Sequence, residues 1–129
     1  MTQAQTRARV WAIRLPYVKP PLSLNARQHW AARARETRMV RSDVRLLVRA
    51  ARVPPLSRVR VQLEYTPRDG RRRDTDNLVA TLKAVCDGVV DAGVVPDDTP
   101  EFMGKPEPVI TAPDRVDPHL RLLLVEEVL

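Results

Sequence analysis

Residues 71–93 read RRRDTDNLVATLKAVCDGVVDAG, and this stretch decides both the predicted fold and the predicted site. Its apolar residues recur at three- and four-residue spacing, so they share one side of a helix over about residues 77–92. Gly93 is expected to end this helix, since glycine readily adopts the left-handed conformation found at helix C-termini. Three polar side chains gather on the opposite side of the same helix: Asp76, Lys83 and Asp87.

Two pairs of carboxylates frame this helix. Asp74 and Asp76 come just before it, directly after three arginines, and Asp97 and Asp98 follow it beyond Pro96. Arginine attracts phosphate, whereas clustered carboxylates repel it. A hard divalent cation such as Mg²⁺ or Mn²⁺, placed between carboxylate and phosphate, makes the two compatible. The stretch therefore predicts a metal site for phosphate chemistry; the alternative for either of the first two acids is a simple helix cap.

These residues resemble the signature of the RusA family of Holliday-junction resolvases. The similarity covers about residues 10–125 and rests on the following positions: Arg72-Arg73-Asp74-Thr75-Asp76-Asn77-Leu78, Lys83, Asp87, Gly93 and Asp97-Asp98, with Leu15-Pro16 and Leu24-Asn25 nearer the N-terminus. It implies a Mg²⁺-dependent endonuclease, with Mn²⁺ as the alternative metal and no organic cofactor. Such an enzyme acts as a homodimer on four-way DNA junctions in recombination and repair.

The resemblance also implies a role for each matching residue. Four residues would be catalytic, the three acids among them as metal ligands: Asp74, Asp76, Asp98 and Lys83. Arg72 and Arg73 would contact DNA phosphate. Further candidates are Asp97, Asp87 and Asn77, where Asp97 is alternatively a turn residue and Asp87 a surface partner of Lys83.

One position departs from the family pattern. The family's lysine follows the asparagine of the motif by three positions, where this chain has Ala80. Lys83 follows Asn77 by six positions instead, which displaces it by about 4.5 Å along the helix axis. Lys83 is therefore either the family lysine in a shifted place or an ordinary charge on the helix surface.

The charge of the chain is uneven. The net charge is +6, yet the first 60 residues carry 14 basic and 2 acidic side chains, whereas residues 74–129 carry 4 and 12. A basic half dominated by arginine predicts a polyanionic partner, because guanidinium groups bind phosphate in a bidentate manner. The alternative is an arginine-rich composition without a role in binding.

A first helix is expected over about residues 28–52, with an apolar side around Val40, Val44 and Val48. The Trp30 side chain is expected to pack in the core, with stacking on a nucleic-acid base as the alternative. The basic residues of this helix form one row, which predicts a track for the DNA backbone, or else a solvated surface: Arg38, Arg41, Arg45, Arg49 and Arg52.

Strands are predicted over residues 10–15, 59–65 and 120–125, with a short edge strand within 105–111. The fold class is α/β (α+β): a small mixed sheet with two main helices packed mainly on one side. The near-continuous apolar run of the last strand predicts burial on both faces, or on one face in an oligomer interface. One domain is expected over residues 1–129, with residues 1–9 flexible.

Several classes are disfavoured by what the sequence lacks. A single cysteine allows no intramolecular disulfide, no C-x-x-C pattern is present, and no apolar run is long enough to span a membrane. A cytoplasmic protein without membrane partners is expected. Two alternatives to a junction-cutting nuclease stay open: a DNA-binding protein without cleavage activity, and another metal-dependent phosphoesterase.

Overall fold

Five strands form one mixed sheet in the computed structural model, which describes residues 8–22 and 29–128. Their order is β1-β5-β2-β3, and β4 also pairs with β2. β5 is antiparallel to both β1 and β2, whereas β3 and β4 are parallel to β2. The bounds are β1 Val10–Arg14, β2 Val59–Thr66, β3 Met103–Gly104, β4 Val109–Ile110 and β5 His119–Glu126.

The two long central strands carry the core. In β2, Val59, Val61 and Leu63 are fully buried, and they alternate with more exposed polar residues as the sequence predicts. In β5, the even-numbered leucines from Leu120 to Leu124 are buried on the same side, while Leu123 is half-exposed on the other. The last strand is therefore buried fully on one face only.

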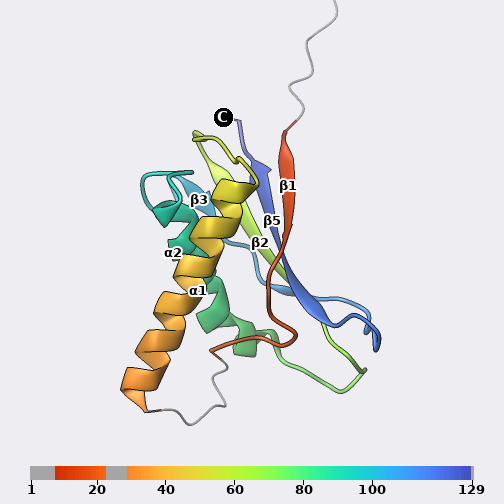
Figure 1. Cartoon of the computed structure of the whole chain (residues 1–129). Helices are drawn as coiled ribbons and strands as arrows, with labels where there is room; N and C mark the ends of the chain where they lie inside the picture. The colour runs from red at the N-terminus through yellow and green to blue at the C-terminus, as the bar shows by residue number, and fades with distance from the viewer. Residues whose placement is uncertain (1–7, 23–28, 129) are drawn as a thin grey trace, which may run out of the picture.

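Both helices cover one side of the sheet (Figure 1). They are α1 (Trp30–Ala50) and α2 (Val79–Asp91), the latter preceded by a 3₁₀ turn, η1 (Thr75–Leu78). A mixed sheet with two helices on it confirms the predicted α+β class. Neither helix in the described part of the chain is long and apolar enough to cross a membrane.

The end of α1 comes slightly earlier than the sequence predicts. Arg52 has a positive φ of 58°, so it lies outside the helix rather than being its last residue. Its N–H bonds to the Arg49 carbonyl, and the N–H of Val53 bonds to the Val48 carbonyl. This pattern satisfies the last carbonyls of the helix in the manner of a Schellman motif, here with arginine in the place usual for glycine.

The two helices touch backbone to side chain at Gly88 of α2. A Cβ added there would lie 2.7 Å from Val44 Cβ and 2.9 Å from the Arg41 carbonyl oxygen, both of α1. Only a residue without a side chain permits this approach.

The predicted glycine stop of α2 is confirmed as well, because Gly93 has a φ of +88°.

Trp30 is not in the core, contrary to the sequence-based expectation. Its side chain is 76% exposed, and its ring lies 5.6 Å from the neighbouring ring of His29, measured between ring centroids. The buried residues of α1 begin at Val40, so the first turns of the helix extend past the core. Leu24 and Asn25, which contribute to the family resemblance, lie outside the described residues.

Candidate functional site

The Asp74 carboxylate organises the turn that leads into α2. Asp74 caps η1: its Oδ1 accepts a hydrogen bond from the Asp76 N–H at 3.1 Å, and its carbonyl accepts one from the Asn77 N–H at 3.2 Å. Helical structure therefore begins at Thr75, two residues before the predicted start at about Asn77, as a 3₁₀ turn that continues into α2 at Val79. The cap explains the shift, because a carboxylate that satisfies early N–H groups begins helical structure at once.

Two of the arginines before this turn, Arg71 and Arg73, fold back onto Asp69. Arg73 donates to the Asp69 carboxylate at 2.8 Å and to its carbonyl at 2.7 Å, and its guanidinium lies 5.9 Å from the centre of the Tyr65 ring. Arg71 donates to the same carboxylate at 3.2 Å. These bonds, led by that from Arg73, hold the pKa of Asp69 well below its ordinary range. The Arg73 guanidinium is thus held in place by Asp69.

The two acids of the turn consequently keep their charges available. Among the described residues, neither the Asp74 nor the Asp76 carboxylate forms an ion pair, although three arginines precede them. Both side chains belong to exposed residues, and so does Arg72. The predicted metal ligands of the turn and the predicted phosphate contact at Arg72 therefore face solvent.

A second cluster of charges lies further along the exposed side of α2. Asp98 Oδ2 accepts hydrogen bonds from Lys83 Nζ at 2.7 Å and from Lys105 Nζ at 3.2 Å. Lys83 also donates to Asp87 at 3.2 Å. The bonds from Lys83 and Lys105 lower the pKa of Asp98 to about 2, and the bond to Asp98, followed by that to Asp87, raises the pKa of Lys83.

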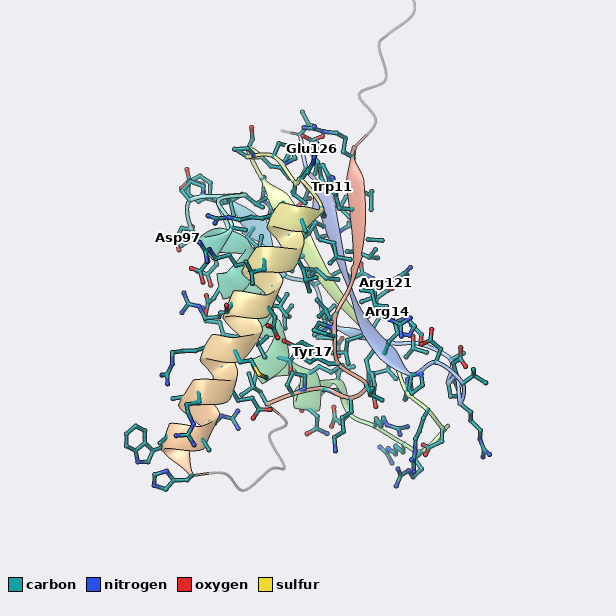
Figure 2. All side chains as sticks on the ribbon, viewed as in Figure 1. Trp11, Arg14, Tyr17, Asp97, Arg121 and Glu126 are labelled. Carbon is teal, nitrogen blue, oxygen red and sulfur yellow. The ribbon has the colours of Figure 1, made fainter. Side chains whose placement is uncertain are left out.

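Asp97 has a local structural role beside this cluster. Its Oδ1 accepts the N–H of Asp98 at 2.8 Å, which fixes the bend after Pro96. The residue is exposed and lies on the opposite side of the molecule from Arg14 and Arg121 (Figure 2). Asp97 therefore makes the contact expected of a turn residue, and Asp87 makes the contact expected of a surface partner of Lys83.

The predicted site residues thus form two groups rather than one. Asp98 lies beside Lys83, and Lys83 is seven positions beyond Asp76, about 10 Å along a helix axis. In the described part of the chain, no three His, Cys, Asp or Glu side chains lie close enough together to hold a metal. The exposed side of α2 nevertheless connects both groups.

The arginine row of α1 is interrupted at Arg41. Its guanidinium forms two hydrogen bonds of 3.0 Å with the Asp91 carboxylate at the end of α2. Arg41 is therefore already paired with a carboxylate, unlike a free phosphate contact. Arg38 and Arg49 are exposed and Arg45 is half-exposed, and no ion pair of theirs occurs among the described residues.

A pocket of about 800 Å³ adjoins the Asp74 turn. Arg71, Arg73, Asp74 and Asn77 line one part of it, and residues 16–22 line another. That segment is fixed from two sides. The buried Thr81 hydroxyl of α2 donates to the Pro21 carbonyl, and the Tyr17 hydroxyl, which points toward α1 in Figure 2, donates to Asp43 at 2.7 Å.

Three residues of these groups were not among the sequence-based candidates. They are Asp69, Asp91 and Lys105. Asp91 and Lys105 reach partners at Arg41 and Asp98 that no local periodicity connects to them. Their placement depends on how the helices cross and on where β3 joins the sheet.

Comparison with known proteins gives little further constraint. No family model matches the chain. A protein from Xylella fastidiosa that carries the name "uncharacterized protein" is 29% identical over 86 residues, which cover 63% of this chain and 56% of that protein. The chain thus spans about half the length of this relative.

Proposed function

We propose that the protein is a Mg²⁺-dependent endonuclease that cuts branched DNA and resolves four-way junctions as a homodimer. The observation that carries this proposal is the availability of Asp74 and Asp76. Both carboxylates stay without an ion pair in the described structure, while Arg71 and Arg73 in front of them bind Asp69 instead. Such an arrangement leaves negative charge beside a phosphate-attracting segment, which favours a bound cation.

The donor set fits Mg²⁺. This ion is commonly held by one or two carboxylates together with water and substrate phosphates, rather than by a complete protein cage. Asp74 and Asp76 supply the two carboxylates, and Asp98 would join them only after exchanging its lysine partners. When bound, Mg²⁺ or Mn²⁺ would lower the pKa of a coordinated water and stabilise charge on the phosphate.

The remaining residues would bind and orient the DNA. Lys83 would add positive charge near the scissile phosphate, where charge develops during hydrolysis. Arg72 is exposed next to the turn, and the row on α1 offers Arg38, Arg45 and Arg49 for backbone phosphates. A four-way junction is cut at two symmetric positions, so a two-fold homodimer would match the symmetry of the substrate.

A labelled four-way junction, a linear duplex and a flap, each incubated with Mg²⁺ or with EDTA, test the proposal. Paired symmetric nicks in the junction, seen only with the metal, are expected. Asp76→Asn should abolish cleavage while junction binding is retained or improved, because it removes a metal ligand and a source of phosphate repulsion at nearly constant shape. Asp98→Asn should act likewise, and Asp97→Asn more mildly.

Asp117→Asn is a matched control. It removes the same charge from a carboxylate that pairs with Arg14, and Arg14 lies on the opposite side of the molecule from Asp97 (Figure 2). This variant should cleave like the parent. Full Mg²⁺-dependent cleavage by Asp76→Asn, or the absence of any cleavage by the parent, would contradict the proposal.

A DNA-binding protein without cleavage activity is the second candidate. It is favoured by the structural uses of two predicted ligands, since Asp74 caps η1 and Asp98 accepts bonds from two lysines. Junction binding without nicks under every metal condition would support this candidate. Cleavage of small phosphodiesters but not of DNA would support another phosphoesterase.

A further inference from the structure

Lys105 shares a single oxygen atom with Lys83. Both ammonium groups donate to Asp98 Oδ2, at 3.2 Å and 2.7 Å respectively. Their nitrogen atoms therefore lie within about 6 Å of each other, a separation at which two like charges repel unless an anion lies between them. The protein thus holds an anionic oxygen between two lysines that are 22 positions apart in the sequence.

Lys105 is fixed in this place by the sheet. It directly follows β3, whose Met103 is 2% exposed and whose two residues pair with Val59 and Arg60 of β2. The side chain of Lys105 is 34% exposed, against 62% for Lys83. The paired strand therefore anchors the backbone immediately before Lys105, next to the Asp98 carboxylate that its side chain contacts.

The two lysines differ in how much they depend on Asp98. Lys83 has a second acidic partner in Asp87, at 3.2 Å. For Lys105, Asp98 is the acidic partner found among the described residues. If Asp98 turned toward another cation, Lys83 would keep a counter-charge and Lys105 would lose its own. Lys105 is therefore the better placed of the two to take up an external anion.

We propose that Lys105 is a phosphate-binding residue that, together with Lys83, holds a DNA phosphodiester in the place now taken by the Asp98 carboxylate. This inference rests on the proposed function, for which it supplies a further contact to the substrate. A non-bridging phosphate oxygen carries the same kind of charge as Oδ2 of Asp98 and accepts the same charge-assisted hydrogen bonds. The alternative is a tether, in which Lys105 only attaches the segment after α2 to the helix.

Binding of the labelled junction in EDTA, measured over a series of salt concentrations with variants made in the Asp98→Asn background, where no carboxylate competes for the two lysines, distinguishes the two. Lys105→Gln should weaken binding and reduce the slope of log K against log salt by about 0.9, the value for one phosphate contact on duplex DNA. Lys105→Arg should keep the slope. Arg121→Gln removes an equal charge on the opposite side of the molecule from Asp97 and should change the slope little (Figure 2).

Asp98→Asn provides the decisive comparison. It should tighten binding in EDTA, because both lysines lose their internal anion, and Lys105→Gln in the Asp98→Asn background should remove a large part of that gain. A tether would give the opposite pattern: lower thermal stability of Lys105→Gln with unchanged slope and affinity, which would overturn the inference. If the parent binds no junction at all, the proposed function fails and this inference fails with it; a parent that binds and cleaves isolates the role of Lys105.

Discussion

Lys83 Nζ lies 2.7 Å from Asp98 Oδ2, although the two residues are 15 positions apart. The contact brings the second acidic pair back to the middle of α2. It also bears on the lysine displacement, because Ala80, where the family pattern has its lysine, is partly buried against the core. Lys83, rather than residue 80, therefore occupies the exposed position beside Asp98.

Lys83→Ala should slow the chemical step strongly and weaken junction binding only slightly. The lysine would stabilise charge that develops on the phosphate, and the loss of such a donor typically lowers the rate by about 10²- to 10³-fold. Single-turnover cleavage at saturating protein measures the step directly. If the Lys83→Ala variant cleaves the junction at the parental rate, Lys83 is an ordinary surface charge.

Moving the lysine by one turn tests how much its position matters. Ala80→Lys combined with Lys83→Ala places the ammonium about 4.5 Å closer to Asp76 along the axis. Because residue 80 is half-buried, the new side chain must extend along the helix surface to reach solvent. A partial recovery of the single-turnover rate is expected; full recovery would mean that only charge near the turn matters.

The arginine row should contribute to DNA affinity through three residues. Substitution of Arg38, Arg45 and Arg49 together by Gln should reduce the slope of log K against log salt by about 2.7, or 0.9 for each phosphate contact. Glutamine keeps helix propensity, so the fold should persist. An unchanged slope in a folded variant would identify the row as solvated surface.

Arg41→Gln is the matched control within the same helix. Arg41 already binds Asp91 with two hydrogen bonds, so its loss should change the salt slope less than the loss of Arg45. The expected effect is on stability, by no more than about 1 kcal/mol, because the pair is partly exposed. Denaturant unfolding together with the salt series separates the two effects.

Gly88→Ala should destabilise the fold by about 1–3 kcal/mol, since the added methyl group collides with Val44 and with the Arg41 carbonyl. Gly70→Ala is the control, because nothing lies within 4 Å of its Cβ position and its φ is not positive. Gly93→Ala should cost stability for another reason, the positive φ of +88°. Urea unfolding of the three variants gives the order.

Asp98 should contribute to the loss of stability in acid. Lys83 and Lys105 lower its pKa to about 2, whereas the unfolded chain has a value of about 3.9. The folded state thus binds this proton less readily, so the contribution is complete above about pH 4 and is lost as the pH falls toward 2. The Tm of the parent should fall more steeply over this range than that of Asp98→Asn; equal slopes would contradict the assignment.

The parts of the fold set by local pattern were predictable from the sequence. The period of two in Val59–Thr66 and the three- and four-residue spacing in α2 report directly which side is buried. Trp30 was not predictable in this way, because helical spacing says nothing about where the core ends along a helix. β3 was missed as well, since two residues are too few for any period to appear.

The grouping and pairing of the candidate residues could not be predicted from the sequence. The sequence placed Asp74, Asp76, Asp98 and Lys83 in one site, whereas the structure separates Lys83 and Asp98 from the Asp74 turn. The sequence did not reveal that Arg73 binds Asp69 or that Lys105 joins Asp98, because these contacts depend on loop paths and on the docking of β3. Ion pairs of this kind carry no spacing rule, unlike a helix face.

If the protein binds DNA as proposed, the contact at Gly88 has a consequence for which DNA it binds. Since the backbone of α2 lies directly against α1 there, the arginine row and the acidic turn cannot shift relative to each other without losing that contact. A DNA molecule that reaches both must then adapt its own shape, and the cost depends on how easily it bends. Branched or interrupted duplexes bend at a lower energetic cost than continuous ones. The protein would therefore prefer them even without any contact to the bases.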